Sequence, residues 1–162
     1  MMKRMNWRQD QEYLALVSDL LARPEVQRLQ TITHHHYSNR LEHSINVSYQ
    51  SYLWGKKYSL DTRALARGGL LHDLFYYDWD PHQMDFRTHA HLHAQIALNN
   101  AEHLTDLSAK ERDIIVKHMF GATPELPCYP ESWIVSLVDD YCAVEEALAP
   151  KLINWKQKML LK

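Results

Sequence analysis

Apolar residues recur along most of this chain at spacings of three and four, the pattern of helices with one buried face. The first such stretch runs from Arg8 to Leu21 and ends at Arg23. Pro24 can open a short second helix, because proline is favourable in the first helical turn. No stretch alternates as a half-exposed strand does. We predict helices over residues 8–21, 24–30, 40–58, 62–74, 89–103, 108–119, 132–148 and 151–162.

Polar residues stand where several of these helices should begin. Ser38 or Asn39 can cap the helix over 40–58, and Asp61 can cap the next one, because their side-chain oxygens accept from free backbone N–H groups. Ser108, followed three residues later by Glu111, forms a capping-box pattern. The connections are predicted to be loops over 31–39, 76–88 and 123–130.

Two glycines, Gly68 and Gly69, lie inside the predicted helix over 62–74. Glycine in a helix interior costs up to about 1 kcal/mol relative to alanine. A compensating gain is expected, and the simplest is close approach of a neighbouring backbone. We therefore predict tight helix packing at this point.

Length and composition favour a single all-α domain, a helical bundle of about seven or eight helices. The chain has 162 residues, 46% of them hydrophobic, and only four glycines. This length suits one domain with its own core. The candidate functional residues described below lie over about 40–146, and we expect the N-terminal helices of 1–39 and the tail of 150–162 to pack on that motif-bearing core.

Charge and cysteine usage exclude several classes of protein. The formal net charge is −2, which gives no basic field for duplex nucleic acid or a membrane surface. No apolar run approaches the ~20 residues of a membrane span, and residues 1–10 lack the apolar centre of a signal peptide. Two cysteines, Cys128 and Cys142, are too few for a disulfide framework. A reducing, cytoplasmic location is expected.

Candidate chemistry begins with histidine, of which the chain has eleven. His72 and Asp73 follow an apolar run, and both residue types bind divalent cations. Adjacent helical residues point about 100° apart, so both reach one ion only near a helix end. The alternative is that His72 caps the helix and Asp73 pairs with a nearby base.

Other residues of these types lie on apolar helical faces. His43 lies one turn before Val47, and Asp139 lies between Val135 and Cys142 on one stripe. An ionised carboxylate facing a core is costly unless it is paired or binds metal. The alternatives are that His43 is a satisfied core histidine and that Asp139 caps or pairs with Arg67.

Two further helices add inward histidines. His118 follows the apolar pair Ile114 and Ile115, while His89 and His93 share one helical face. Taken singly, each is more easily explained as a structural residue. Taken together, four helices each deliver an inward histidine or aspartate, which is how helical bundles build metal sites.

The order of these residues resembles the H…HD…D pattern of the HD superfamily of metal-dependent phosphohydrolases. The segment 93–97 resembles the superfamily's "His-Pro-x-x-Gly/Ala" element, with Ala94 in place of proline, and His118 resembles a second extra histidine of its two-metal members. The segment 137–141 resembles its closing "Ala-Asp-x-Tyr". The resemblance covers about 40–146 and is nearest to small bacterial proteins of unassigned substrate, with a six-ligand layout shared by dinucleoside tetraphosphate hydrolases.

This resemblance implies a metal-activated hydroxide that attacks a phosphate ester or anhydride. One divalent ion would be bound by four residues and a second ion by three, with Asp73 binding both. Because the ligands are imidazoles and carboxylates, the suitable metals are Fe, Mn, Co, Ni or Zn. The two implied sets are His43, His72, Asp73 and Asp139, and Asp73, His93 and His118. The pair Leu74-Phe75 in place of Ile-Gly after Asp73, with no Gly-Tyr-Pro, argues against cleavage of cyclic dinucleotides.

Positive charge is also needed at a phosphate. Arg40 lies one turn before His43 and can grip phosphate bidentately, and Lys117 adjoins His118. We therefore predict catalytic roles for Asp73, Arg40 and Lys117; solvated surface charge is the alternative for the two cations. Asp78 is read as a loop acid. Three histidines are expected near the site entrance: His34, His35 and His36.

The expected substrate is a small phosphorylated molecule, a nucleotide or a relative of one. The aromatic loop after Asp73 could stack on a nucleobase, although packing on the bundle is the preferred interpretation. Two alternatives stay open: a non-catalytic nucleotide- or metal-binding regulatory domain, and a structural helical protein. The sequence leaves open the type of phosphate bond, the metal and whether the chain forms homo-oligomers.

Overall fold

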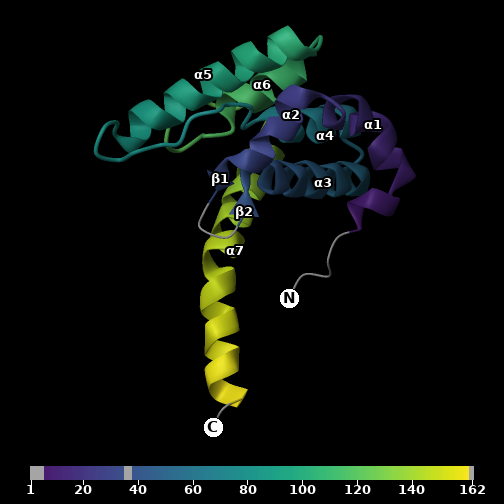
Figure 1. Ribbon diagram of the computed structural model, residues 1–162. Coiled ribbons are helices and arrows are strands. Elements are labelled where there is room, and N and C mark those ends of the chain that lie inside the picture. The colour runs from purple at the N-terminus through teal and green to yellow at the C-terminus, as the bar shows by residue number, and fades with distance from the viewer. Residues whose placement is uncertain (1–5, 35–37, 161–162) are drawn as a thin grey trace.

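The protein is described from a computed structural model, which covers residues 6–34 and 38–160 (Figure 1). Within these ranges it has seven α-helices, two short 3-10 helices and one minimal hairpin, so the predicted all-α architecture is confirmed. The helices are α1 (Gln11–Leu21), α2 (Pro24–Gln27), α3 (Arg40–Tyr58), α4 (Thr62–Leu71), α5 (Phe86–Leu104), α6 (Ala109–Lys117) and α7 (Pro130–Leu160). The 3-10 helices are η1 (Trp7–Gln9) and η2 (Arg28–Thr31).

The predicted helix caps are present. The Asn39 side chain accepts from the Glu42 N–H at the start of α3, and Asp61 accepts from the Ala64 N–H at the start of α4. Ser108 and Glu111 form the reciprocal capping box of α6. These bonds satisfy donors that the first helical turn leaves free, which is why the starts of these helices follow from local sequence.

Several helix boundaries differ from the predicted ones. Helix α5 begins at Phe86, three residues earlier than expected, because Asp85 accepts from the N–H groups of Arg87 and Thr88. Helices α4 and α6 end earlier than expected, at Leu71 and Lys117. The two histidines that follow them, His72 and His118, therefore stand at helix ends.

The predicted break at Pro150 was wrong. Helix α7 runs without interruption from residue 130 to residue 160. Proline has a helical φ of its own, and inside a helix it can remove one hydrogen bond without ending the helix. We also expected residues 150–162 to pack on the bundle, whereas the last turns of α7 extend beyond the other helices in Figure 1.

Residues 31–39, predicted to be a loop, contain a short antiparallel pairing. Strand β1 (Thr33–His34) pairs with β2 (Ser38–Asn39). Pairing over two residues leaves no alternation that a sequence pattern could reveal. His35 and His36 lie outside the described residues, so their expected place near the site stays a prediction, as does that of the His34 side chain.

Helices α3 and α4 form the centre of the molecule, with α1 on one side and α6 and α7 on the other (Figure 1). Tyr13 of α1 is fully buried, and its hydroxyl lies 2.8 Å from Ser48 Oγ of α3. The Ser48 hydroxyl in turn donates to the Ala66 carbonyl of α4 at 2.6 Å. This chain of polar contacts joins three helices inside the main apolar cluster.

The predicted close approach at the paired glycines is confirmed. A Cβ atom on Gly69 would lie 2.9 Å from the backbone Cα of Ser48 in α3, closer than such atoms approach in proteins. A Cβ atom on Gly68 would lie 2.8 Å from the Ile114 side chain in α6. Helix α4 can therefore contact both neighbours closely, which brings the end of α4 among the other helices.

Membrane insertion receives no support from the helices. Within residues 6–34 and 38–160, every helix is too short or too polar to cross a bilayer.

The glycine contacts predict a difference between two alanine substitutions. Gly69→Ala should lower the free energy of unfolding by about 1–3 kcal/mol, the usual cost of overpacking, because the Ser48 backbone cannot move aside. Gly68→Ala should cost less, because the atoms met there belong to the Ile114 side chain, which can shift farther than the Ser48 backbone. Urea unfolding followed by circular dichroism measures both. Equal or reversed losses would contradict the packing described.

Candidate metal centre

Six predicted side chains converge between the helices. They come from α3, the end of α4, α5, the end of α6 and α7, and none is more than 9% exposed. The convergence includes residues nearly a hundred positions apart in the sequence. The six residues are His43, His72, Asp73, His93, His118 and Asp139.

One half of the cluster is arranged around Asp139. Its Oδ1 lies 2.8 Å from His43 Nε2 and 3.5 Å from His72 Nε2. His72 Nε2 lies 3.9 Å from Asp73 Oδ2. Ligand atoms of His43, His72 and Asp73 all lie within 4.8 Å of one another, so one cation could contact all three.

The other half faces the second oxygen of Asp73. Asp73 Oδ1 lies 3.5 Å from His93 Nε2 and 3.7 Å from His118 Nε2. The two histidine Nε2 atoms are 2.9 Å apart. Asp73 therefore directs one oxygen to each half of the cluster, and its carboxylate lies between two groups of candidate ligands.

Backbone carbonyls fix the orientation of three of the imidazoles. A carbonyl oxygen can only accept, so Nδ1 of each ring carries the hydrogen and Nε2 faces the centre, the arrangement typical of metal-binding histidines. The three donors and acceptors are His72 Nδ1 to Gly69 O (2.8 Å), His93 Nδ1 to His89 O (2.9 Å) and His118 Nδ1 to Ile115 O (2.8 Å).

His43 is oriented by a carboxylate that the sequence analysis did not single out. Its Nδ1 lies 3.1 Å from Glu146 Oε1. Glu146 is seven residues after Asp139, and therefore lies on the same face of α7 two turns later. That spacing was a usable signal, because carboxylates commonly orient histidines that bind metal.

The centre leaves polar atoms that a cation would satisfy. His72 Nε2 is buried and has no hydrogen-bond partner among the described residues. His93 and His118 have Nδ1–H groups bonded elsewhere, so in their neutral forms two Nε2 lone pairs face each other at 2.9 Å. Two facing lone pairs repel unless a proton or a metal ion lies between or beside them. The donor set therefore fits a divalent cation.

Ionisation of the cluster is set by burial and by mutual charge. Burial, assisted by the charge of His118, lowers the pKa of His93 to about 4, so this imidazole is neutral at neutral pH. Burial alone would raise the pKa of Asp73, but the neighbouring histidines outweigh it and hold that pKa well below its usual range. The carboxylate is thus ionised and His93 is neutral, as metal ligation requires.

His43 has the opposite shift. Burial alone would lower its pKa, but the hydrogen-bonded carboxylates of Asp139 and Glu146 raise it to about 10. Without a cation, a proton on His43 therefore balances buried negative charge. A divalent cation would supply that balance in place of the proton.

A cavity of about 440 Å³ opens onto four of the six residues of the centre: Asp73, His93, His118 and Asp139. Arg40 lines this cavity and is 4% exposed. Its Nη1 donates to the Phe75 carbonyl at 2.8 Å, and its guanidinium carbon lies 3.7 Å from the centre of the Phe75 ring. Arg40 thus holds the segment after Asp73 while its guanidinium remains part of the cavity wall. Asp78 and Asp140 also line the cavity.

The aromatic loop both packs on the bundle and lines the cavity. Phe75 is buried, as the preferred interpretation expected, whereas Trp79 is 38% exposed and stacks on the His89 ring at 5.0 Å. His89 lies beside His93, with ring centres 4.8 Å apart. The Tyr77 hydroxyl lies 3.2 Å from His89 Nδ1.

Lys117 is not among the residues that line the cavity, so the structure gives its predicted catalytic role no support. Its Nζ lies 2.7 Å from Asp113 Oδ1 and donates to Cys128 Sγ at 2.9 Å. The reason is helical geometry: adjacent side chains point about 100° apart, and His118 is the one directed inward. Lys117 instead joins α6 to the segment before α7.

The alternative partner considered for Asp139 was also wrong. Arg67 pairs with Asp19 at 2.7 Å and lies 3.4 Å from Glu111, whereas Asp139 faces histidines. His91, between the inward His89 and His93, has a 56% exposed side chain.

Comparison with known proteins gives one match. The model of the family described as HD domain matches residues 40–144, about two thirds of the chain. No curated protein and no solved structure matches the chain.

The geometry predicts measurable binding of a divalent cation. Co²⁺ or Mn²⁺ should raise the melting temperature and a chelator should reverse the rise, because an ion bound only by the folded state at 100 times its Kd contributes about 2.7 kcal/mol. His93→Gln should weaken binding by about tenfold or more, because it removes an inward ligand. Calorimetric titration and metal analysis of the purified protein measure both.

His103→Gln is the matched control. His103 lies on the same helix and its Nδ1 donates to the Asn99 carbonyl at 2.7 Å, as His93 donates to His89, but His103 is exposed. Its substitution should leave metal affinity unchanged. Equal losses in the two variants would show that binding occurs elsewhere.

Proposed function

Since the chain belongs to the HD domain family, we propose that it is a metal-dependent phosphohydrolase that cleaves a phosphate ester or anhydride of a nucleotide or a related small molecule. The observation that supports this most directly is that four buried histidines and two buried carboxylates form three overlapping groups of candidate metal ligands beside a cavity. Buried carboxylates of this kind are costly unless a cation compensates them.

We assign the ligands to two sets that share Asp73. The first set is His43, His72, Asp73 and Asp139, and the second is Asp73, His93 and His118. Mixed imidazole and carboxylate donors suit Fe, Mn, Co, Ni or Zn, as one ion or two. Bound there, such ions supply Lewis acidity and lower the pKa of a bound water toward neutrality.

The residues of the chain itself prepare this chemistry. Carbonyl and carboxylate acceptors hold each imidazole in one orientation, so little reorganisation is needed when a ligand binds. Burial excludes bulk water from the cluster, and a low-dielectric site strengthens every charge interaction within it. Asp73 is the central group, because its two oxygens address the two sets.

Arg40 is the residue proposed to meet the phosphate. It is the only Lys or Arg among the described residues that line the cavity. Its guanidinium already donates to the Phe75 carbonyl, and planar guanidinium groups bind phosphate oxygens bidentately. A single cationic side chain beside a metal centre suits a small phosphate better than a long polyanion.

Cavity size and lining support a small substrate with an apolar or aromatic part. A volume of about 440 Å³ is within the usual range of small-molecule sites. The exposed parts of Trp79 and Phe86 lie on its wall and offer an aromatic surface for a nucleobase. A cytoplasmic location and the absence of duplex nucleic acid as a partner remain predictions from composition.

Substitution of Asp73 tests the proposal. Asp73→Ala should lower the turnover of a phosphate ester by about two orders of magnitude or more, because both ligand sets lose a member. The assay is phosphate release from nucleotides and a chromogenic phosphoester with Mn²⁺ or Co²⁺ present, with His103→Gln as the control. Circular dichroism should show an unchanged helix signal.

Full activity of Asp73→Ala would end the proposal. Tight nucleotide binding by the wild-type protein with no hydrolysis across the panel would favour a regulatory domain instead.

A further inference from the structure

His89 of α5 is a histidine of the cavity wall that lies outside the candidate metal ligands. It is 9% exposed, lines the cavity and belongs to none of the three groups of candidate ligands. Its backbone carbonyl accepts from Nδ1 of His93, but its own imidazole takes no part in that bond. Because buried polar atoms normally have partners, the bonding of its two ring nitrogens indicates what this side chain does.

Aromatic neighbours hold the His89 ring in one position. The Trp79 indole stacks on it, with ring centres 5.0 Å apart and planes 16° apart, and Phe75 contacts it at 5.9 Å and 69°. On its other side the His93 ring lies 4.8 Å away. His89 therefore stands on the cavity wall between a candidate metal ligand and the partly exposed indole that is proposed to face a nucleobase.

The Tyr77 hydroxyl determines which nitrogen of His89 carries the hydrogen. This hydroxyl lies 3.2 Å from Nδ1. Burial raises the pKa of Tyr77, so the phenol is protonated at neutral pH. Burial, assisted by the charge of His93, lowers the pKa of His89 to about 4, so its imidazole is neutral. A phenol O–H is a better donor than a neutral imidazole N–H, and an imidazole lone pair is the better acceptor. Tyr77 therefore donates to Nδ1, and Nε2 carries the hydrogen.

The Nε2–H group of His89 has no acceptor within the described part of the chain. The only hydrogen bond of the ring there is the one from Tyr77 to Nδ1. Nε2 of His72 is enclosed, whereas Nε2 of His89 remains accessible. Since His89 lines the cavity, an oxygen atom of a bound molecule can accept from it there.

Phe75 places a second donor near His89. The guanidinium carbon of Arg40 lies 3.7 Å from the centre of the Phe75 ring, and the His89 and His93 rings lie 5.9 Å and 5.0 Å from the same centre. Arg40, His89 and His93 all line the cavity. A phosphate group carries several oxygens, so different donors can bind it at the same time.

We propose that His89 is a substrate-binding residue, which donates its Nε2–H to a non-bridging phosphate oxygen beside the guanidinium of Arg40. This inference rests on the proposed phosphohydrolase function and adds one specific donor to it. A neutral donor suits this position, because it can hold a phosphate oxygen without repelling a cation bound by His93. The phosphoryl group would lie at the metal-ligand end of the wall, with the rest of the substrate toward Trp79.

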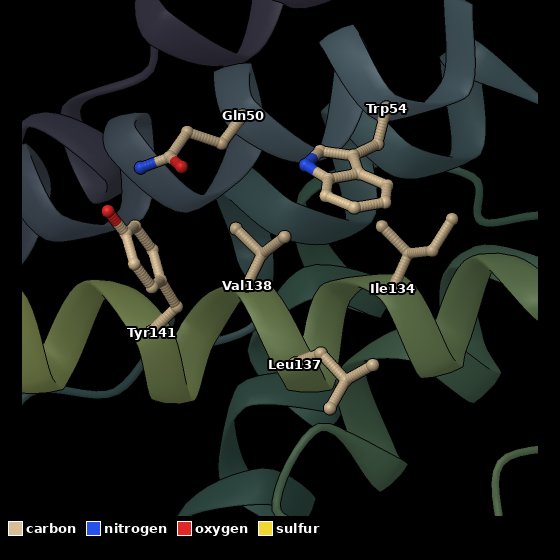
Figure 2. A pocket seen from close by; sticks show the side chains of 6 residues that line it. All are labelled: Gln50, Trp54, Ile134, Leu137, Val138 and Tyr141. Carbon is tan, nitrogen blue, oxygen red and sulfur yellow. The ribbon is translucent and has the colours of Figure 1, made fainter. Parts of the chain in front are cut away.

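A second hollow of the molecule lacks these donors. Figure 2 shows a groove of about 360 Å³ in which Gln50 and Trp54 of α3 are directed toward Ile134 and Val138 of α7. Among the residues that the structure describes, its lining contains no charged side chain and no imidazole. An exposed indole thus occurs in both hollows, but only the cavity of the metal centre combines one with donors for an anion.

Binding of inorganic phosphate to the Mn²⁺-loaded protein tests the donor directly. His89→Phe keeps an aromatic ring against Trp79 but removes the N–H group. Phosphate affinity, measured by calorimetric titration, should fall about tenfold or more, as expected for loss of a hydrogen bond to a charged group. KM for a hydrolysed phosphoester should rise by a similar factor. Mn²⁺ affinity should stay unchanged, because the backbone carbonyl that orients His93 is retained.

Two further variants of α5 separate the donor from the ring. His89→Gln places an amide N–H near the position of Nε2, so it should restore most of the phosphate affinity that His89→Phe loses. His91→Phe is the matched control, because His91 lies on the same helix with a 56% exposed side chain and does not line the cavity. An unchanged affinity in His89→Phe, or equal losses in His89→Phe and His89→Gln, would overturn the proposal.

Tyr77→Phe tests the role assigned to the hydroxyl. Without it the hydrogen of His89 can move to Nδ1 in part of the molecules, so phosphate affinity should fall, but by less than in His89→Phe. In a His89→Phe background the same change should have no further effect, because residues that act through one contact are not additive. Additive losses would show that Tyr77 acts independently of His89 and would overturn the assignment of the hydrogen to Nε2.

The phosphate titration also distinguishes this donor from the hydrolase activity. A wild-type protein that binds phosphate through His89 but hydrolyses no phosphoester would support the donor and remove the activity. Hydrolysis with an unchanged KM and phosphate affinity in His89→Phe would do the reverse. A Mn²⁺-loaded wild-type protein that binds no phosphate would overturn the role of His89.

Discussion

Two buried carboxylates impose the constraint on which the rest of this structure depends. Asp73 and Asp139 are ionised and almost inaccessible to water, so each must have positive charge or strong donors beside it. Four histidines meet that need from four directions. Their outer nitrogens are held by carbonyls or by Glu146, which fixes the rings and leaves the inner nitrogens facing the carboxylates. The same histidines that compensate the buried negative charge are therefore also placed to bind a cation.

The ends of the helices make this arrangement possible. Helices α4 and α6 stop at Leu71 and Lys117, so His72 and His118 are the residues that cap these helix ends. Their Nε2 atoms lie near the carboxylates of the centre. Their Nδ1 atoms bond carbonyls of the last turn, which also satisfies acceptors that a helix end leaves free. The glycines of α4 let this helix approach α3 and α6 closely enough for the ends to meet.

Helix α7 has two faces of different character. One face contributes Asp139 and Glu146 to the centre, and the other carries exposed apolar residues, among them Leu137 and Val144. Metal ligands require positions fixed to a fraction of an ångström. The packing of α7 on α3, α4 and α6 therefore bears directly on the position of its ligand in the centre.

Local sequence determined much of this protein: the helical class, the starts of α3, α4 and α6, and the close packing at Gly69. Each of these follows from short-range rules, since caps, periodicity and residue type act within a few positions. The six residues of the centre were singled out differently, by their joint occurrence on several helices and by their resemblance to a family pattern that spans the chain. Tertiary structure alone decided the rest. Arg67 pairs with Asp19 of a distant helix rather than with Asp139. Lys117 forms a local ion pair with Asp113, four residues before it, but its contact with Cys128 depends on the segment before α7. Helix α7 continues through Pro150. The partner of a side chain depends on which groups from other helices lie within reach, and the length of a helix depends on whether other elements obstruct it. A sequence pattern does not record which distant groups come close together.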